Sequence, residues 1–142
     1  MRRRLFIPVF VLVLLCCQSV FASDSILGVW KTVDDDGKTA KSYVDLYEKG
    51  GKVFGKIVKL LQKPQDQLCD KCKDDKKDKP VLGMEIISGL TKRGAVYSGG
   101  KILDPENGKT YDCKIWREGD TLKVRGYVAF FYRTQTWQPV NE

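Results

Sequence analysis

The chain has 142 residues, with 25 Lys and Arg side chains against 18 Asp and Glu, five cysteines and no histidine. The lack of histidine excludes the usual Ser/His/Asp and Cys/His nucleophilic arrangements and the common His-based zinc sites.

The first 22 residues have the three parts of a secretory signal peptide. Residues 2–4 are three arginines, residues 5–15 are apolar apart from one proline, and residues 20–22 place Val and Ala at the −3 and −1 positions of a cut before Ser23. The apolar run is shorter than the roughly 20 residues that span a bilayer. The sequence therefore predicts a signal peptide over residues 1–22 and a periplasmic or secreted product with no transmembrane segment.

Two alternatives to cleavage after Ala22 stay open. In the first, the segment is not cleaved and stays as a membrane anchor. In the second, Cys16 or Cys17 is the lipidated residue of a lipoprotein. Leu15 stands where a lipobox normally has Gly or Ala, which disfavours lipidation at Cys16.

The mature chain, residues 23–142, is long enough for one domain with one modest core. Loss of the three signal-peptide arginines leaves 22 basic and 18 acidic groups, a net charge of +4. We expect no nucleic-acid partner for an exported protein with so mild a charge. The sequence does not determine the oligomeric state.

Alternating apolar and polar residues, separated by turn signals, predict strands along almost the whole mature chain. The predicted strands cover residues 25–33, 42–47, 53–61, 84–90, 95–103, 111–117, 122–130 and 132–140. About eight short strands at regular spacing predict an all-β fold, either a sandwich or an antiparallel up-and-down barrel. A barrel of this size is filled by side chains or holds one small ligand, and both possibilities stay open.

Gly28-Val29-Trp30 at the start of the first strand resembles the G-x-W opening of lipocalins and related calycin barrels. In those folds the Trp closes one barrel end and an Arg from a late strand lies across its ring. The resemblance implies that Arg133 covers Trp30, with Arg125 as the alternative, and Trp137 belongs to the same closing group.

Further segments resemble the exported bacterial family called domain of unknown function 2147, and the match covers nearly the whole mature chain. The carrying segments are Gly28-Val29-Trp30 and residues 79–84, 99–105, 108–111, 114–116, 122–127 and 133–137. The resemblance implies a lipocalin-like barrel and supplies no settled activity.

Cys69 and Cys72 form a C-x-x-C motif that has two interpretations. Flanking lysines would favour a thiolate and a redox pair, whereas an oxidising compartment favours a structural disulfide that staples the loop. The sequence predicts a Cys69–Cys72 disulfide with Cys113 as a buried free thiol in its strand. A three-thiolate metal site lacks a fourth protein ligand, so we expect no metal. Residues 70–79 mix five lysines with four aspartates and predict a solvated, mobile loop.

Cationic and aromatic side chains gather on the last strands and suggest a ligand site. The candidate ligand-binding residues are Lys114, Trp116, Arg125, Tyr127 and Gln135. An arginine that points into the barrel would hold the carboxylate of a fatty acid or similar amphiphile.

Two functions remain open. The first is an exported binding protein that takes a small amphiphilic or lipid-like ligand into the barrel. The second is a non-catalytic envelope interaction or structural protein with a filled barrel and a disulfide-stapled loop. The acidic residues stand mostly in turns and no catalytic constellation is visible, so we expect neither an enzyme nor a cofactor.

Overall fold

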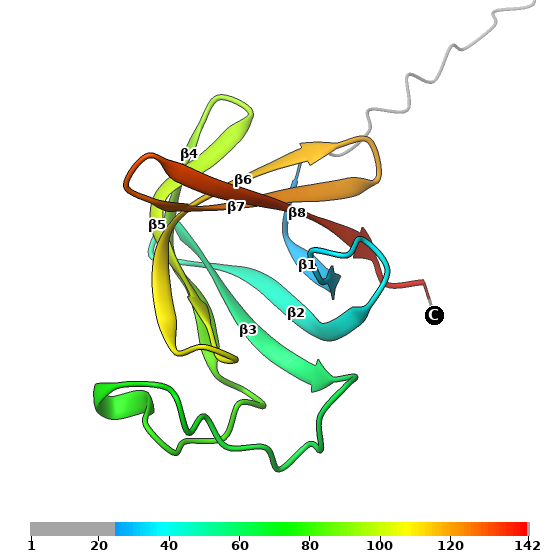
Figure 1. Cartoon of the computed structure of the whole chain (residues 1–142). Coiled ribbons are helices and arrows are strands. Elements are labelled where there is room, and N and C mark those ends of the chain that lie inside the picture. The colour runs from blue at the N-terminus through cyan, green and yellow to red at the C-terminus, as the bar shows by residue number, and fades with distance from the viewer. Residues whose placement is uncertain (1–24, 142) are drawn as a thin grey trace, which may run out of the picture.

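The computed structural model describes residues 25–141, so the predicted signal peptide lies outside the described residues (Figure 1). The chain forms eight strands and one short 3-10 helix, η1. They are β1 (Gly28–Val33), β2 (Ala40–Lys49), β3 (Lys52–Leu60), η1 (Asp74–Lys76), β4 (Glu85–Arg93), β5 (Val96–Asp104), β6 (Lys109–Glu118), β7 (Thr121–Val128) and β8 (Phe131–Pro139). Within this part of the chain no helix has the length and hydrophobicity needed to cross a membrane.

The strands form a closed antiparallel barrel in chain order. Each strand pairs with the next, and β1 closes the barrel against β8 through Trp30 opposite Pro139 and Lys31 opposite Gln138. Figure 1 looks obliquely into one end of this barrel, with the long β3–β4 connection below it. The up-and-down barrel is therefore confirmed, and the sandwich is excluded.

The sequence placed the turn between the last two strands one residue too late. It assigned residues 122–130 and 132–140 to strands, whereas Val128 pairs with Phe131 and the turn is Ala129-Phe130. Favoured two-residue hairpin turns contain Asn, Asp or Gly. Ala129 and Phe130 are not turn-favouring residues. The apolar pattern of the strand therefore continues through the turn, and the sequence gives no sign of where the strand ends.

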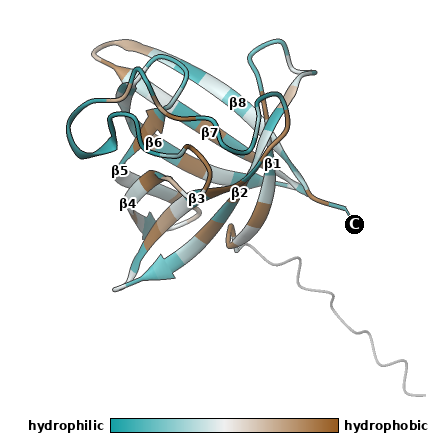
Figure 2. Cartoon of the chain, turned by 90° about the horizontal axis from the view of Figure 1, so that it is seen from below, coloured by the Kyte–Doolittle hydropathy of each residue, from teal (hydrophilic) through white to brown (hydrophobic). Residues whose placement is uncertain are grey.

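Alternation along the strands divides the barrel into an inner apolar face and an outer polar one, as the bands of Figure 2 show. The residues whose side chains are almost completely inaccessible lie on the inner face or under the barrel end, and they include Ile26, Leu46, Ile87, Leu90, Ile115 and Leu122. These side chains fill one half of the barrel. The other half is hollow and forms the candidate site.

Candidate ligand-binding cavity

The filled end of the barrel is closed by Trp30, which is only 4% exposed. Its indole Nε1 donates a hydrogen bond to the carbonyl of Ile26 at 2.8 Å. The guanidinium of Arg117, and not that of Arg133 or Arg125, lies over the ring at 5.4 Å. The predicted Arg133 closure is wrong because Arg133 stands at the opposite end of β8, where it pairs with Asp35 at 2.7 Å.

The other end of the barrel opens into a cavity of about 730 Å³. This volume lies within the range of about 300–1,000 Å³ typical of small-molecule sites. Its wall is mixed: polar and charged side chains contribute nearly half of it, and the apolar part includes Ile57, Leu60, Val81, Ile86, Ile102, Leu103, Val124 and Trp137. The barrel therefore has room for one apolar molecule of modest size.

Several polar groups of the wall are hydrogen-bonded to one another. The hydroxyls of Thr32 and Ser42 are 2.9 Å apart and hydrogen-bonded to each other. The indole Nε1 of Trp137 donates to the Gln135 side-chain oxygen at 3.2 Å, and the Gln135 amide in turn donates to Asp35 at 3.0 Å. These groups therefore have hydrogen-bond partners within the wall itself.

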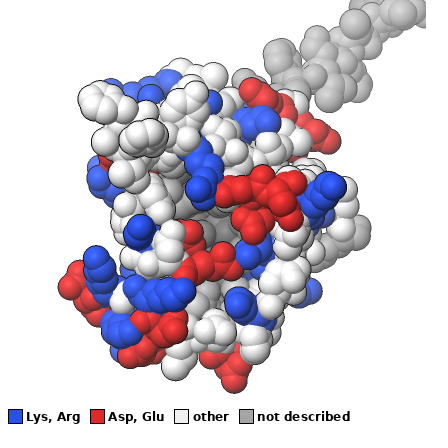
Figure 3. Space-filling model, viewed as in Figure 1, with Lys and Arg blue, Asp and Glu red and all other residues white. Residues whose placement is uncertain are grey.

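Charged side chains of both signs surround the opening, and Figure 3 shows red and blue groups around the hollow. Arg133 contacts Asp35, and Lys41 contacts Glu106 at 2.7 Å and Asp34 at 3.5 Å. The hydrogen bond that Lys41 donates to Glu106 is the main cause that raises the pKa of Lys41, and so holds it in the charged form. The cavity thus has an apolar interior beneath a zwitterionic rim.

The β3–β4 connection forms one wall of the opening. Cys69 and Cys72 form the predicted disulfide, and both are buried. The Cys69 amide donates to the Lys79 carbonyl at 2.8 Å, and the Asp78 amide donates to the Cys69 carbonyl at 2.9 Å. This segment is largely exposed as predicted, and its own hydrogen bonds fold it back on itself.

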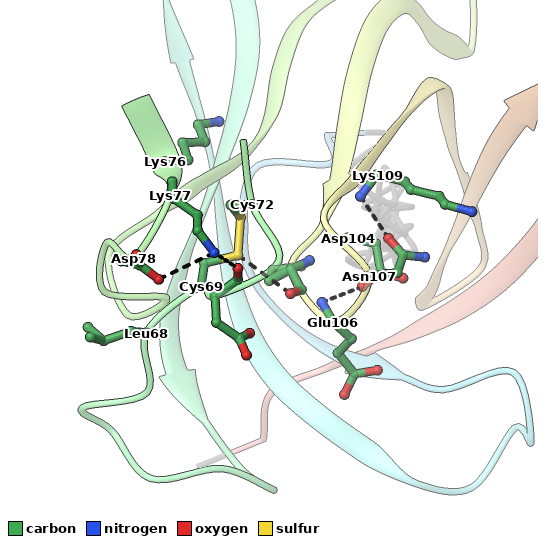
Figure 4. Close-up of a disulfide and its surroundings, with 12 residues drawn as sticks. Leu68, Cys69, Cys72, Lys76, Lys77, Asp78, Asp104, Glu106, Asn107 and Lys109 are labelled. Atoms are coloured by element: carbon green, nitrogen blue, oxygen red, sulfur yellow. Dashed lines mark hydrogen bonds and ion pairs between the residues drawn. A yellow bond between two sulfur atoms is a disulfide. The ribbon is translucent and has the colours of Figure 1, made fainter. Parts of the chain in front are cut away.

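The disulfide segment packs against the turn between β5 and β6 (Figure 4). Cys69 Sγ lies 3.5 Å from the carbonyl oxygen of Pro105. Gly108 has φ +72°, and a Cβ there would lie 1.8 Å from the Lys71 carbonyl oxygen. Only glycine permits so close an approach. The loop is therefore seated on the barrel by backbone contact as well as by its disulfide.

Cys113 is the free, buried thiol that the sequence predicted. It lies on the inner face of β6, and burial raises its pKa to about 12. A thiol in that state is unreactive. Among residues 25–141 no group of three or more His, Cys, Asp or Glu side chains is placed to hold a metal ion.

Of the five predicted ligand-binding residues, only Gln135 lines the cavity. The other four alternate along β6 and β7 with the buried residues Ile115 and Val124, so their side chains lie on the outer face. They are Lys114, Trp116, Arg125 and Tyr127. The idea that Arg125 holds a carboxylate inside the barrel is therefore wrong. Alternation grouped each strand's residues correctly but did not show which face points inward.

Most residues of the cavity wall were not predicted as binding residues from the sequence. Four of these residues lie on correctly predicted strands, but nothing in their sequence pattern indicated a binding site. They are Thr32, Ser42, Ile102 and Tyr111. One clue was available: small or polar residues interrupt the inner-face pattern at Ser42 and Gly126, where a filled barrel would have large apolar side chains.

A closed eight-stranded antiparallel barrel with one filled end and one open cavity defines a lipocalin-like fold. A similar solved structure is that of protein HP1028 from Helicobacter pylori, described as belonging to the lipocalin family. The two share 18% sequence identity with a TM-score of 0.74, over 84% of this chain and 86% of that one. At this identity the likeness shows the fold alone.

Residues 28–139 match the family described as "Uncharacterized protein conserved in bacteria (DUF2147)". Because the match spans well over half of the sequence, the chain belongs to this family. No protein with a curated description matches it.

Proposed function

We propose that this protein is an exported, non-catalytic binding protein that holds one small amphiphile in the open half of its barrel. The observation that carries the proposal is the cavity of about 730 Å³, whose wall combines aliphatic and aromatic side chains with polar and charged ones. Burial of an apolar ligand surface there is favourable by about 25 cal/mol per Å². The alternative of a filled barrel has no comparable support, because side chains fill only the end closed by Trp30.

The rim supports a ligand with a polar end. Arg133, Lys41, Asp35 and Glu106 present both signs of charge at the opening. A polar head group at this position remains hydrated and can form hydrogen bonds with both the cationic and the anionic side chains of the rim. The apolar body of the ligand then lies inside the cavity. The ligand therefore combines an apolar body with a compact polar head.

Export is supported by the disulfide and by the signal-like first 22 residues, because disulfides persist in oxidising compartments. Binding without catalysis is supported by the absence of histidine in the sequence and by the state of the rim carboxylates. Asp34, Asp35 and Glu106 each form an ion pair with Lys41 or Arg133.

The test is a titration with cis-parinaric acid, a fluorescent fatty acid whose emission rises in an apolar site. We expect saturable binding at one site in the wild type. Ile102 lines the cavity, and Ile102→Trp fills part of it. This variant should bind at least about tenfold more weakly, a loss of about 1.4 kcal/mol.

The matched control is Val58→Trp, which adds the same ring on the outer face of β3. It should bind the probe as the wild type does. Equal binding by Ile102→Trp and the wild type, or no saturable binding by the wild type, would contradict the proposal. Thermal melts of all three proteins check that the barrel is intact.

A further inference from the structure

The hairpin between β7 and β8 carries an exposed aromatic tip. Phe130 is 98% exposed, Phe131 79% and Tyr132 61%, and Val128 on the other strand is 52% exposed. Single exposed apolar side chains are ordinary on protein surfaces, but a contiguous group marks an interaction site. Figure 3 shows uncharged atoms over the upper left of the molecule, where Figure 1 places this hairpin.

Folding does not explain the composition of this turn. Ala129 has φ +51° while Phe130 has a negative φ, the pattern of a type II′ turn, whose first position favours glycine. Alanine in this conformation is strained, and Phe130 buries almost nothing. Residues that break a local rule without a gain in stability are expected at functional sites.

Cations and aromatic rings continue from the tip along the outer face of β6, β7 and β8. The Arg125 guanidinium lies 5.0 Å from the ring centroid of Trp116 and 4.3 Å from that of Tyr132. Lys114 lies 5.3 Å from the ring of Tyr127, which itself packs 5.9 Å from Tyr132. We call these five residues the aromatic–cationic strip.

The strip carries positive charge that no carboxylate offsets by an ion pair. Its neighbours Lys101 and Lys123 are paired with Asp112 and Glu118. Within residues 25–141, Lys114 and Arg125 form no such pair. Glu118 does accept a hydrogen bond from the Trp116 indole at 3.2 Å, at the end of the strip away from the tip.

We propose that the hairpin tip and the strip dock on an anionic lipid bilayer. Phe130 and Phe131 would enter the interface, and the amphipathic Tyr and Trp rings would lie at head-group level, where such rings are enriched. Lys114 and Arg125 would meet lipid phosphates, because anionic surfaces attract clustered cations. A narrow projecting tip suits a yielding lipid interface better than a rigid protein surface.

The tip borders the cavity, because Val128, Phe131 and Tyr132 also line its opening. Docking there brings the opening close to the lipid surface, so that an amphiphile has a short path between membrane and barrel. The acidic β1–β2 turn lies beside the hairpin, where Asp35 is paired with Arg133, so the attraction to an anionic surface comes from Lys114 and Arg125 of the strip. Docking does not require that the cavity hold a ligand.

The experiment is co-sedimentation of the protein with vesicles of phosphatidylcholine, alone or mixed with phosphatidylglycerol. We expect binding that requires phosphatidylglycerol. Phe130→Ser/Phe131→Ser should lower the partition coefficient at least about tenfold through lost apolar insertion. Lys114→Gln/Arg125→Gln should lower it about 25-fold, at about fivefold for each cation.

Matched controls change the same chemistry elsewhere. Val29→Ser/Val58→Ser removes two exposed apolar side chains from β1 and β3, and Lys52→Gln/Lys56→Gln removes two charges from β3. Both should bind within about twofold of the wild type. Because the substituted hairpin residues are exposed, the melting temperatures of the variants should stay close to that of the wild type. Differences in vesicle binding should therefore not result from unfolding.

Three results would overturn the proposal: no vesicle binding by the wild type, equal losses in hairpin and control variants, or self-association through the hairpin in place of vesicle binding. Sedimentation velocity detects the last of these and would assign the tip to a protein contact. Ile102→Trp should bind vesicles normally even though it fails to bind cis-parinaric acid. Failure of cavity binding and failure of membrane docking are therefore distinguishable.

Discussion

The guanidinium of Arg117 lies across the ring of Trp30, and its Nη1 donates a 2.7 Å hydrogen bond to the carbonyl of Ser25. Trp30 in turn donates to the carbonyl of Ile26. These contacts hold residues 25–26 across the filled end of the barrel. The closure over Trp30 is therefore built from the end of β6, at the opposite end from the cavity.

Arg117→Ala should lower the free energy of unfolding by about 1–2 kcal/mol, because it removes a partly buried cation–π contact and a charge-assisted hydrogen bond. Arg133→Ala is the matched control. Its ion pair with Asp35 is exposed and should contribute less than about 1 kcal/mol. Urea denaturation measures both changes. A larger loss for Arg133→Ala than for Arg117→Ala would contradict this account of the closure.

Replacement of the disulfide by Cys69→Ala/Cys72→Ala should cost about 2 kcal/mol, because the bond closes a very short loop. Most of the effect should be local. Amide hydrogen exchange is expected to accelerate at Cys69 and Asp78 while that of β6 changes little, since the loop makes its own hydrogen bonds. Uniform acceleration across the barrel would mean that the bond holds the whole fold together.

Gly108→Ala tests the seating of the same loop. Its Cβ would collide with the Lys71 carbonyl, so the disulfide segment must shift away from the β5–β6 turn. We expect a loss of stability of about 1–3 kcal/mol and faster proteolysis after the loop lysines. Gly119→Ala, in an open turn with the same sign of φ, controls for backbone strain. Similar proteolysis of the two variants would show that the contact at Gly108 is unimportant.

Asp36 should titrate well below an ordinary aspartate. The hydroxyl of Thr39, followed by the backbone amides of Thr39 and Lys38, donates to its carboxylate and lowers its pKa to about 2. Because the folded pKa is depressed, ionised Asp36 stabilises the turn above about pH 4, and this contribution is lost as the pH falls through about 2. NMR titration of the side chain measures the pKa directly.

Thr39→Val removes the strongest of these donors and should raise the pKa of Asp36 toward its ordinary value. Thr39→Ser keeps the hydroxyl and serves as the control. An unchanged pKa in Thr39→Val would show that the backbone amides alone are responsible.

Cys113 should resist iodoacetamide at pH 8 in the native protein and react once urea unfolds it, because burial raises the pKa of its thiol to about 12. The raised pKa means that its contribution to stability is complete below the ordinary thiol pKa of about 9 and is lost as the pH rises toward 12. Mass spectrometry counts the modified cysteines. Rapid modification of the native protein would show that the inner face of β6 is accessible.

Strand positions were predictable because the alternation of residues directly reflects the pleat of each strand. The pattern fitted both a sandwich and a barrel, and the resemblance to lipocalin-like proteins favoured the barrel. The disulfide and the buried Cys113 were also predictable, from spacing and strand position. The site was not. Alternation gives two faces without saying which is inner, so Arg125 and its neighbours were placed in the barrel. The partner of Trp30 was missed because Arg133 stands at the far end of β8, whereas Arg117 near the end of β6 reaches the ring.

The most direct test of ligand binding is native mass spectrometry of the protein as purified from the cells that produce it. The account predicts a bound small molecule in the wild type and in Val58→Trp, released on unfolding, and its loss or strong depletion in Ile102→Trp. A bare protein mass in all three, or the same adduct in all three, would contradict the claim that the open half of the barrel holds an amphiphile.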